Sequence, residues 1–101
     1  MIPTRPDMRE DEIEWPIVKG AEKQGWGVRK IQWIGRKSAP DRMFFKAGRI
    51  VFIEFKRPGE EPRQDQAREI KRLLDQKLEA YAIDSKEQAC EVLNLDPDQV
   101  E

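Results

Sequence analysis

The chain has 101 residues, which suffice for one small domain with a single core but not for two. Charged residues make up 39% and hydrophobic residues 38%, so the core must be thin, and oligomerisation would help to cover it. Histidine is absent, which excludes His-ligated zinc and Ser-His-Asp hydrolysis, and the single cysteine, Cys90, excludes an intrachain disulfide framework.

The first third of the chain predicts an arm, a helix and a strand. Residues 1–7 contain two prolines and are expected to form a flexible N-terminal arm. Residues 10–24 predict a helix with apolar residues at four-residue spacing, closed by Gly25 and Gly27. Pro16 must kink this helix or mark its real start, because proline lacks the backbone donor and clashes with the preceding turn. Residues 28–34 predict the first strand.

The middle of the chain predicts a β-hairpin, with strands at 42–46 and 49–55 around Ala47-Gly48. The second strand contains the most apolar run, residues 50–53, which is typical of a buried strand. Alternation along it places Glu54 and Lys56 on one face. The hairpin folds Asp41, which follows the stiff Pro40, back toward the same end of the sheet.

Two carboxylates and a lysine are therefore expected to converge. Asp41 and Glu54 suit a hard cation such as Mg²⁺ or Mn²⁺, and the main-chain carbonyl of Phe55 is a further ligand. Lys56 would lower the pKa of an attacking water or stabilise the charge of the transition state in phosphodiester cleavage. The alternative for Glu54 and Lys56 alone is a solvated pair at the rim of the sheet.

The last part of the chain predicts helix, strand and helix. Residues 62–78 form a helix with one apolar stripe, and Gln66 and Arg63 lie on its other face. Residues 81–83 form a short strand, Ser85 and Gln88 cap a final helix through Leu93, and residues 96–101 form a frayed tail. The order α-β-β-β-α-β-α predicts an α/β domain over residues 8–95, with a mixed central sheet flanked by helices.

Pro40-Asp41, the hairpin and Glu54-Phe55-Lys56 resemble the PD-(D/E)xK nuclease superfamily. The following Arg57-Pro58-Gly59 turn and the helix with Gln66 resemble its VRR-NUC branch. The resemblance implies a restriction-endonuclease-like core in which Asp41, Glu54, Lys56 and Gln66 are catalytic. It also implies an acid on the first helix that faces the metal.

Glu14 is the match for that first-helix acid, with Glu10 second, and an ordinary solvated helix face is the alternative for both. The family's usual glycine shortly before Pro-Asp is replaced here by Ser38-Ala39.

Basic residues gather around the expected site. The whole chain has a net charge of −1, but residues 29–72 hold 13 Lys or Arg against 6 Asp or Glu. Such a cluster provides the cations that nucleic-acid binding needs, although solubilising charges would give the same count. The expected DNA-binding residues are Arg36, Lys37, Arg42, Arg57 and Arg63.

The resulting hypothesis is a Mg²⁺- or Mn²⁺-dependent, structure-specific DNA endonuclease, similar to phage-type stand-alone VRR-NUC enzymes that resolve Holliday junctions. We expect a homodimer, since two matching strands must be cut. The alternatives are a flap-cutting or restriction-like nuclease subunit and a non-catalytic nucleic-acid-binding module. No apolar run approaches the roughly 18 residues of a membrane span and the N-terminus does not resemble a signal peptide, so we expect a cytoplasmic protein without a membrane partner, in a bacterial cell or a phage-infected host.

Overall fold

A computed structural model describes all residues, 1–101, and contains the expected order of elements. These elements are α1 (Glu10–Lys23), β1 (Gly27–Lys30), β2 (Arg42–Lys46), β3 (Arg49–Phe55), α2 (Gln64–Asp75), β4 (Glu79–Ile83), α3 (Lys86–Leu93) and the short 3₁₀-helix η1 (Pro97–Gln99). The prediction of an α/β domain with flanking helices is confirmed.

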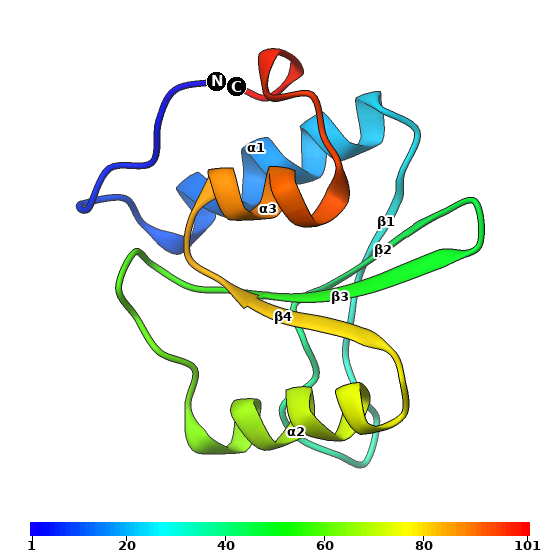
Figure 1. Ribbon diagram of the computed structural model, residues 1–101. Coiled ribbons are helices and arrows are strands. Elements are labelled where there is room, and N and C mark those ends of the chain that lie inside the picture. The colour runs from blue at the N-terminus through cyan, green and yellow to red at the C-terminus, as the bar shows by residue number, and fades with distance from the viewer.

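The sheet has the strand order β1-β2-β3-β4. The first three strands are antiparallel, whereas β4 runs parallel to β3 because α2 carries the chain back across the sheet. The helices α1 and α3 cover one face of the sheet, and α2 lies on the other (Figure 1). No helix combines the length and the hydropathy needed to cross a membrane.

The main core lies between the sheet and the pair α1 and α3. Val51, Ile53 and Phe55 of β3 are fully buried members of this core. Because side chains alternate along a strand, Glu54 points to the opposite face, where α2 lies. Cys90 of α3 is buried in the core. The alternation in β3 thus places its core residues on the face toward α1 and α3 and Glu54 on the face toward α2.

The hairpin between β2 and β3 closes with Lys46 opposite Arg49. Both turn residues have positive φ, 50° at Ala47 and 84° at Gly48, which is the pattern of a type I′ turn. The turn sets the register that pairs Arg42 with Ile53 and so brings Asp41 to the end of β3.

Two boundaries near the N-terminus differ from the prediction. Pro16 lies inside α1, which begins at Glu10, so the proline does not mark the start of the helix. β1 ends at Lys30 rather than at residue 34. The chain leaves the sheet there because Trp33 turns toward α2, where its indole N–H donates a hydrogen bond to Glu69 at 2.8 Å.

The predicted apolar stripe of α2 faces the sheet only in part, because Ile70 and Leu73 are half-buried beside the buried Gln66 and Glu69. Gln66 and Glu69 are the buried residues of this helix, whereas Ala67 and Leu74 are exposed. The helix also ends at Asp75, and Leu78 beyond it is exposed. Both polar side chains can face inward because each has a hydrogen-bond partner there. Gln66 donates to the Glu54 carboxylate, and Glu69 accepts from the Trp33 indole.

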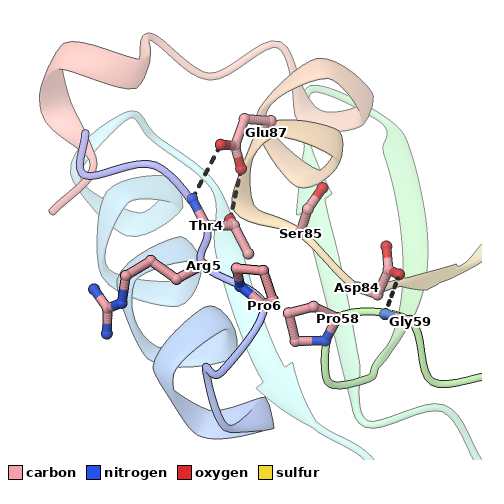
Figure 2. A pocket seen from close by; sticks show the side chains of 8 residues that line it. All are labelled: Thr4, Arg5, Pro6, Pro58, Gly59, Asp84, Ser85 and Glu87. Carbon is pink, nitrogen blue, oxygen red and sulfur yellow. Dashed lines mark hydrogen bonds between the residues drawn. The ribbon is translucent and has the colours of Figure 1, made fainter.

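Both ends of the chain pack against the domain. Thr4 of the N-terminal arm donates hydrogen bonds from its amide and hydroxyl to Glu87 of α3 (Figure 2). The flexibility of the arm stays a prediction. In the tail, Val100 is only 2% exposed and packs against Gly20 of α1, where a Cβ atom would lie 2.7 Å from the valine. The expectation of a frayed tail was therefore wrong for this structure, because the valine completes the core.

Candidate active site

The end of β3 positions the proposed ligands. Asp41 immediately precedes β2, and its Oδ2 accepts a hydrogen bond from the Phe55 amide at 2.8 Å. The preceding residue, Pro40, is buried, and its ring restricts the backbone φ angle just before β2 begins. The convergence of Asp41 with the end of β3, which the hairpin predicted, is present in the structure.

Glu54 is the centre of a small buried network. Its Oε2 accepts a hydrogen bond from the Gln66 amide nitrogen at 2.9 Å and lies 3.6 Å from the Lys56 ammonium. Glu54, Lys56 and Gln66 are only 4%, 6% and 7% exposed. Buried charges are costly unless they are paired, so their presence in one place favours a functional site over a solvated rim pair.

The turn after β3 aims Gln66 at this network. The Glu60 amide bonds to the Arg57 carbonyl at 2.9 Å, and Gly59 has a φ of 81°, so Arg57 to Glu60 form a type II turn. The Gly59 amide donates to Asp84 at the end of β4 (Figure 2). This bond fixes the connection from Lys56 to the first turn of α2.

The first helix presents two acids that behave differently. The Glu14 Oε2 accepts a hydrogen bond from Arg42 at 2.7 Å, and both side chains are largely buried. Glu10, one turn earlier, forms no ion pair, and its pKa is raised by burial and then by the negative charge of Asp41. Glu10 therefore faces the carboxylates without a cation of its own, whereas Glu14 is neutralised by an arginine.

The site carries more negative charge than it neutralises. Burial raises the pKa of Glu54 from 4.5 to about 7, with Asp41 adding to the rise and Lys56 opposing it. Burial also raises the pKa of Asp41, and the Phe55 amide opposes that rise. A cation between these groups would relieve both repulsion and desolvation.

The donor set fits a hard divalent cation. All side-chain donors are carboxylate oxygens, which Mg²⁺ and Mn²⁺ prefer. No set of three or more His, Cys, Asp or Glu side chains already converges as a metal cluster. Asp41 and Glu54 thus form a two-carboxylate site, the kind that leaves several positions for water and phosphate.

The pocket in Figure 2 lies between the N-terminal arm, the Pro58-Gly59 turn and the start of α3. It contains none of the four residues expected to be catalytic, and several of its polar groups are already bonded to one another. Its lining residues are Thr4, Arg5, Pro6, Pro58, Gly59, Asp84, Ser85 and Glu87. The residues that line it serve the fold, since their hydrogen bonds connect the arm to α3 and the turn to the end of β4.

The expected DNA-binding residues fall into two groups. Arg36, Arg57 and Arg63 are exposed, each within 4 Å of a carboxylate, and Lys37 is exposed on the loop before Asp41. Arg42 instead lies over the Trp15 ring and bonds to Glu14, which leaves little of its side chain exposed.

Comparison with known proteins bears on the fold and the family of this chain. No family model matches the chain. A solved structure described as a VRR_NUC domain superimposes with a TM-score of 0.77 at 26% identity, over 84% of this chain and 94% of that one. A protein named "Putative nuclease p44", from Acyrthosiphon pisum secondary endosymbiont phage 1, is 37% identical over 81 residues, which are 79% of this chain and 87% of the relative.

The chain belongs to the VRR-NUC nuclease family. The sequence analysis correctly identified the VRR-NUC resemblance and the restriction-endonuclease-like fold. It ranked Glu14 above Glu10, although Glu10 is the acid that lacks a partner. It also did not single out Glu69, whose position three residues after Gln66 places it on the same buried face of α2.

Proposed function

We propose that this VRR-NUC protein is a Mg²⁺- or Mn²⁺-dependent DNA endonuclease that acts on branched DNA, with a Holliday junction as the preferred substrate. The observation that carries the proposal is the buried network of Glu54, Lys56 and Gln66 beside Asp41. A non-catalytic binding module has no need for two desolvated carboxylates with raised pKa values.

In this proposal, Asp41 and Glu54 would hold the metal with the Phe55 carbonyl, and Glu10 would add a further negative charge beside them. The bound cation supplies Lewis acidity at a phosphate oxygen and lowers the pKa of water. Lys56 projects from the same strand face as Glu54 and stabilises the negative charge that develops on the phosphate. Gln66 orients Glu54 by its amide donor.

A homodimer is the proposed assembly. Leu74 and Leu78 are exposed at the C-terminal end of α2, and Ile50, at the start of β3, is also exposed. Leu78 and Ile50 precede the paired residues Glu79 and Val51, so they lie at the same end of the sheet. This apolar patch lies about 13 Å along β3 from Glu54, which leaves the catalytic end free for DNA.

The assay of choice uses labelled linear duplex, flap, splayed-arm and four-way-junction DNA, each with Mg²⁺, Mn²⁺ or a chelator. We expect metal-dependent cleavage that is fastest on the junction, and no cleavage by Lys56→Met. Equal rates on linear and branched DNA would remove the junction preference, and faster flap cleavage would support the flap-cutting alternative. The absence of cleavage of any DNA with either metal would contradict the nuclease proposal.

The assembly is tested by light scattering. We expect a mass of about 24 kDa, twice the 11.9 kDa of one chain, and a monomer after Leu74→Asp. A wild-type monomer that nicks a single strand per binding event would exclude the two-fold junction resolvase. The cytoplasmic location stays a prediction.

A further inference from the structure

Ile34 is an unusual feature of the segment between β1 and β2, because its side chain is 99% exposed. Single exposed hydrophobic residues are common and by themselves indicate nothing. The environment of Ile34 is what distinguishes it, since the segment is held in place on both sides and a basic surface adjoins it.

Hydrogen bonds to α2 fix the segment before and after Ile34. On one side, Trp33 donates to Glu69 at 2.8 Å, and its ring lies 6.4 Å from that of Phe52. On the other side, the Ser38 hydroxyl donates to Asp65 in the first turn of α2. Figure 1 shows the segment passing beside α2, on the side of the sheet opposite α1 and α3. Ile34 is therefore presented to solvent by an anchored loop.

A basic hollow adjoins this loop. Four cationic side chains and one acidic side chain line it together with Ser38. The cations are Arg36 and Lys37 of the loop and Arg68 and Arg72 of α2. Arg36 and Arg72 both approach the buried carboxylate of Glu69, at 3.8 and 3.0 Å, which holds their guanidinium groups in place. Such a fixed cluster suits the phosphates of a nucleic-acid backbone.

The hollow is connected to the candidate active site through α2. Asp65, which lines the hollow, precedes Gln66, and Gln66 bonds to Glu54. On the loop side, Ser38 is three residues from Asp41. A DNA strand with one phosphate at Asp41 and Glu54 would thus have its neighbouring phosphates on the side where the loop and α2 carry these cations.

We propose that Ile34 is a wedge that inserts against the unstacked bases at the branch point of DNA while the basic hollow binds the neighbouring phosphates. Exposed aliphatic side chains between base steps are an established way for proteins to unstack DNA. The surrounding positive charge favours DNA over a second copy of this chain as the occupant. The proposal rests on the proposed function, since it deepens the choice of branched DNA as the substrate.

The experiment measures binding apart from cleavage. A four-way junction carries 2-aminopurine at the branch point, and a linear duplex carries it at a paired position, both in the presence of Ca²⁺ or chelator. Wild-type protein should raise the fluorescence of the junction, because 2-aminopurine brightens when it is unstacked. Ile34→Ser should abolish this rise and weaken junction binding about tenfold, while affinity for linear duplex stays unchanged. Ile2→Ser, which alters another exposed isoleucine near the N-terminus, is the matched control and should behave as wild type.

The outcomes separate the wedge from the nuclease. If Ile34→Ser keeps the fluorescence rise and the junction affinity, the wedge is overturned, whatever the cleavage assay shows. If Ile34→Ser instead converts a dimer to a monomer in light scattering and weakens both DNAs equally, Ile34 belongs to a protein interface. If wild-type protein cleaves no DNA but shows the Ile34-dependent rise, the proposed nuclease function fails and the wedge stands. Arg68→Glu should weaken binding to both DNAs, since phosphate contacts do not distinguish them.

Discussion

The Gln66 side chain donates its amide N–H to Glu54 at 2.9 Å, and its amide oxygen accepts from the Arg63 backbone at 3.0 Å. One side chain thus joins the end of β3 to the first turn of α2. The amide has a single orientation that satisfies both partners, because the carboxylate needs a donor and the backbone N–H needs an acceptor. The start of α2 and the candidate active site are therefore linked through this one side chain.

Replacing Gln66 by alanine is expected to reduce both stability and cleavage. It removes two hydrogen bonds and leaves the Glu54 carboxylate without its amide donor, which should cost about 1–3 kcal/mol of the free energy of unfolding. Cleavage should fall about 10- to 100-fold because the carboxylate loses its orientation. Urea unfolding and junction cleavage measure the two effects. Gln64→Ala, an exposed change in the same turn, should leave both unchanged. Full activity in Gln66→Ala would exclude the orienting role.

Changes at the charged centre are expected to abolish cleavage with little loss of fold. Glu54→Gln and Lys56→Met keep the shapes of buried side chains while removing their charges. Single-turnover cleavage should fall about 10²- to 10⁴-fold in either variant. Asp41→Asn should behave like Glu54→Gln, since it also removes a charged oxygen donor. Circular dichroism provides the control for folding. A folded variant with wild-type cleavage at either position would exclude this site.

The metal-free protein is expected to lose stability as pH rises between about 4.5 and about 7. The pKa of Glu54 is raised from 4.5 to about 7, so the folded state favours the protonated carboxyl. Its stabilising contribution is complete below the unfolded pKa and is lost as pH rises through the folded pKa. We therefore expect the free energy of unfolding of Glu54→Gln, relative to that of wild type, to be higher at about pH 8 than at about pH 5. Urea unfolding of both proteins with chelator measures this difference.

The matched control for this pH effect is Asp65→Asn. The Ser38 hydroxyl lowers the pKa of Asp65, so that carboxylate stays ionised in both states across the same interval. The difference between Asp65→Asn and wild type should consequently be the same at both pH values. A difference between Glu54→Gln and wild type that does not change with pH would contradict the burial effect at Glu54.

The two acids of α1 are expected to separate into different roles. Glu10→Gln should weaken Mn²⁺ binding and cleavage about 10- to 100-fold, because this carboxylate faces the site without a cation. Glu14→Gln should mainly reduce stability, because it removes the negative charge that pairs with the largely buried Arg42 guanidinium. Calorimetric Mn²⁺ titration and urea unfolding of both variants test the assignment. The reverse pattern would restore Glu14 as the metal-facing acid.

The hairpin turn offers a stabilising change far from the site. Ala47 has a φ of 50°, a conformation that costs alanine more than glycine, which has no Cβ atom, or asparagine, whose side chain can hydrogen-bond locally. Ala47→Asn completes the Asn-Gly pair that type I′ turns favour and should raise the free energy of unfolding by about 0.5–1 kcal/mol. Cleavage should stay at the wild-type level. A loss of stability would mean that the turn does not adopt this conformation.

Local pattern and chain order determined much of this protein from sequence alone. The β-branched run at 50–53 and the Ala47-Gly48 turn specified a hairpin, and alternation along β3 separated Glu54 from the core. Because a hairpin has a defined register, the position of Asp41 near the end of β3 followed as well.

Tertiary packing decided what periodicity does not encode. The apolar residues of α2 predicted its buried face only in part, because the most buried positions are Gln66 and Glu69, whose partners lie on β3 and on the loop before Asp41. The ion pair of Glu14 likewise depends on tertiary packing, because Arg42 reaches it from a neighbouring strand and leaves Glu10 as the acid without a partner. Hydrophobic patterns report burial that is local in sequence, whereas a buried polar side chain is stabilised by a partner that only the folded chain brings within reach.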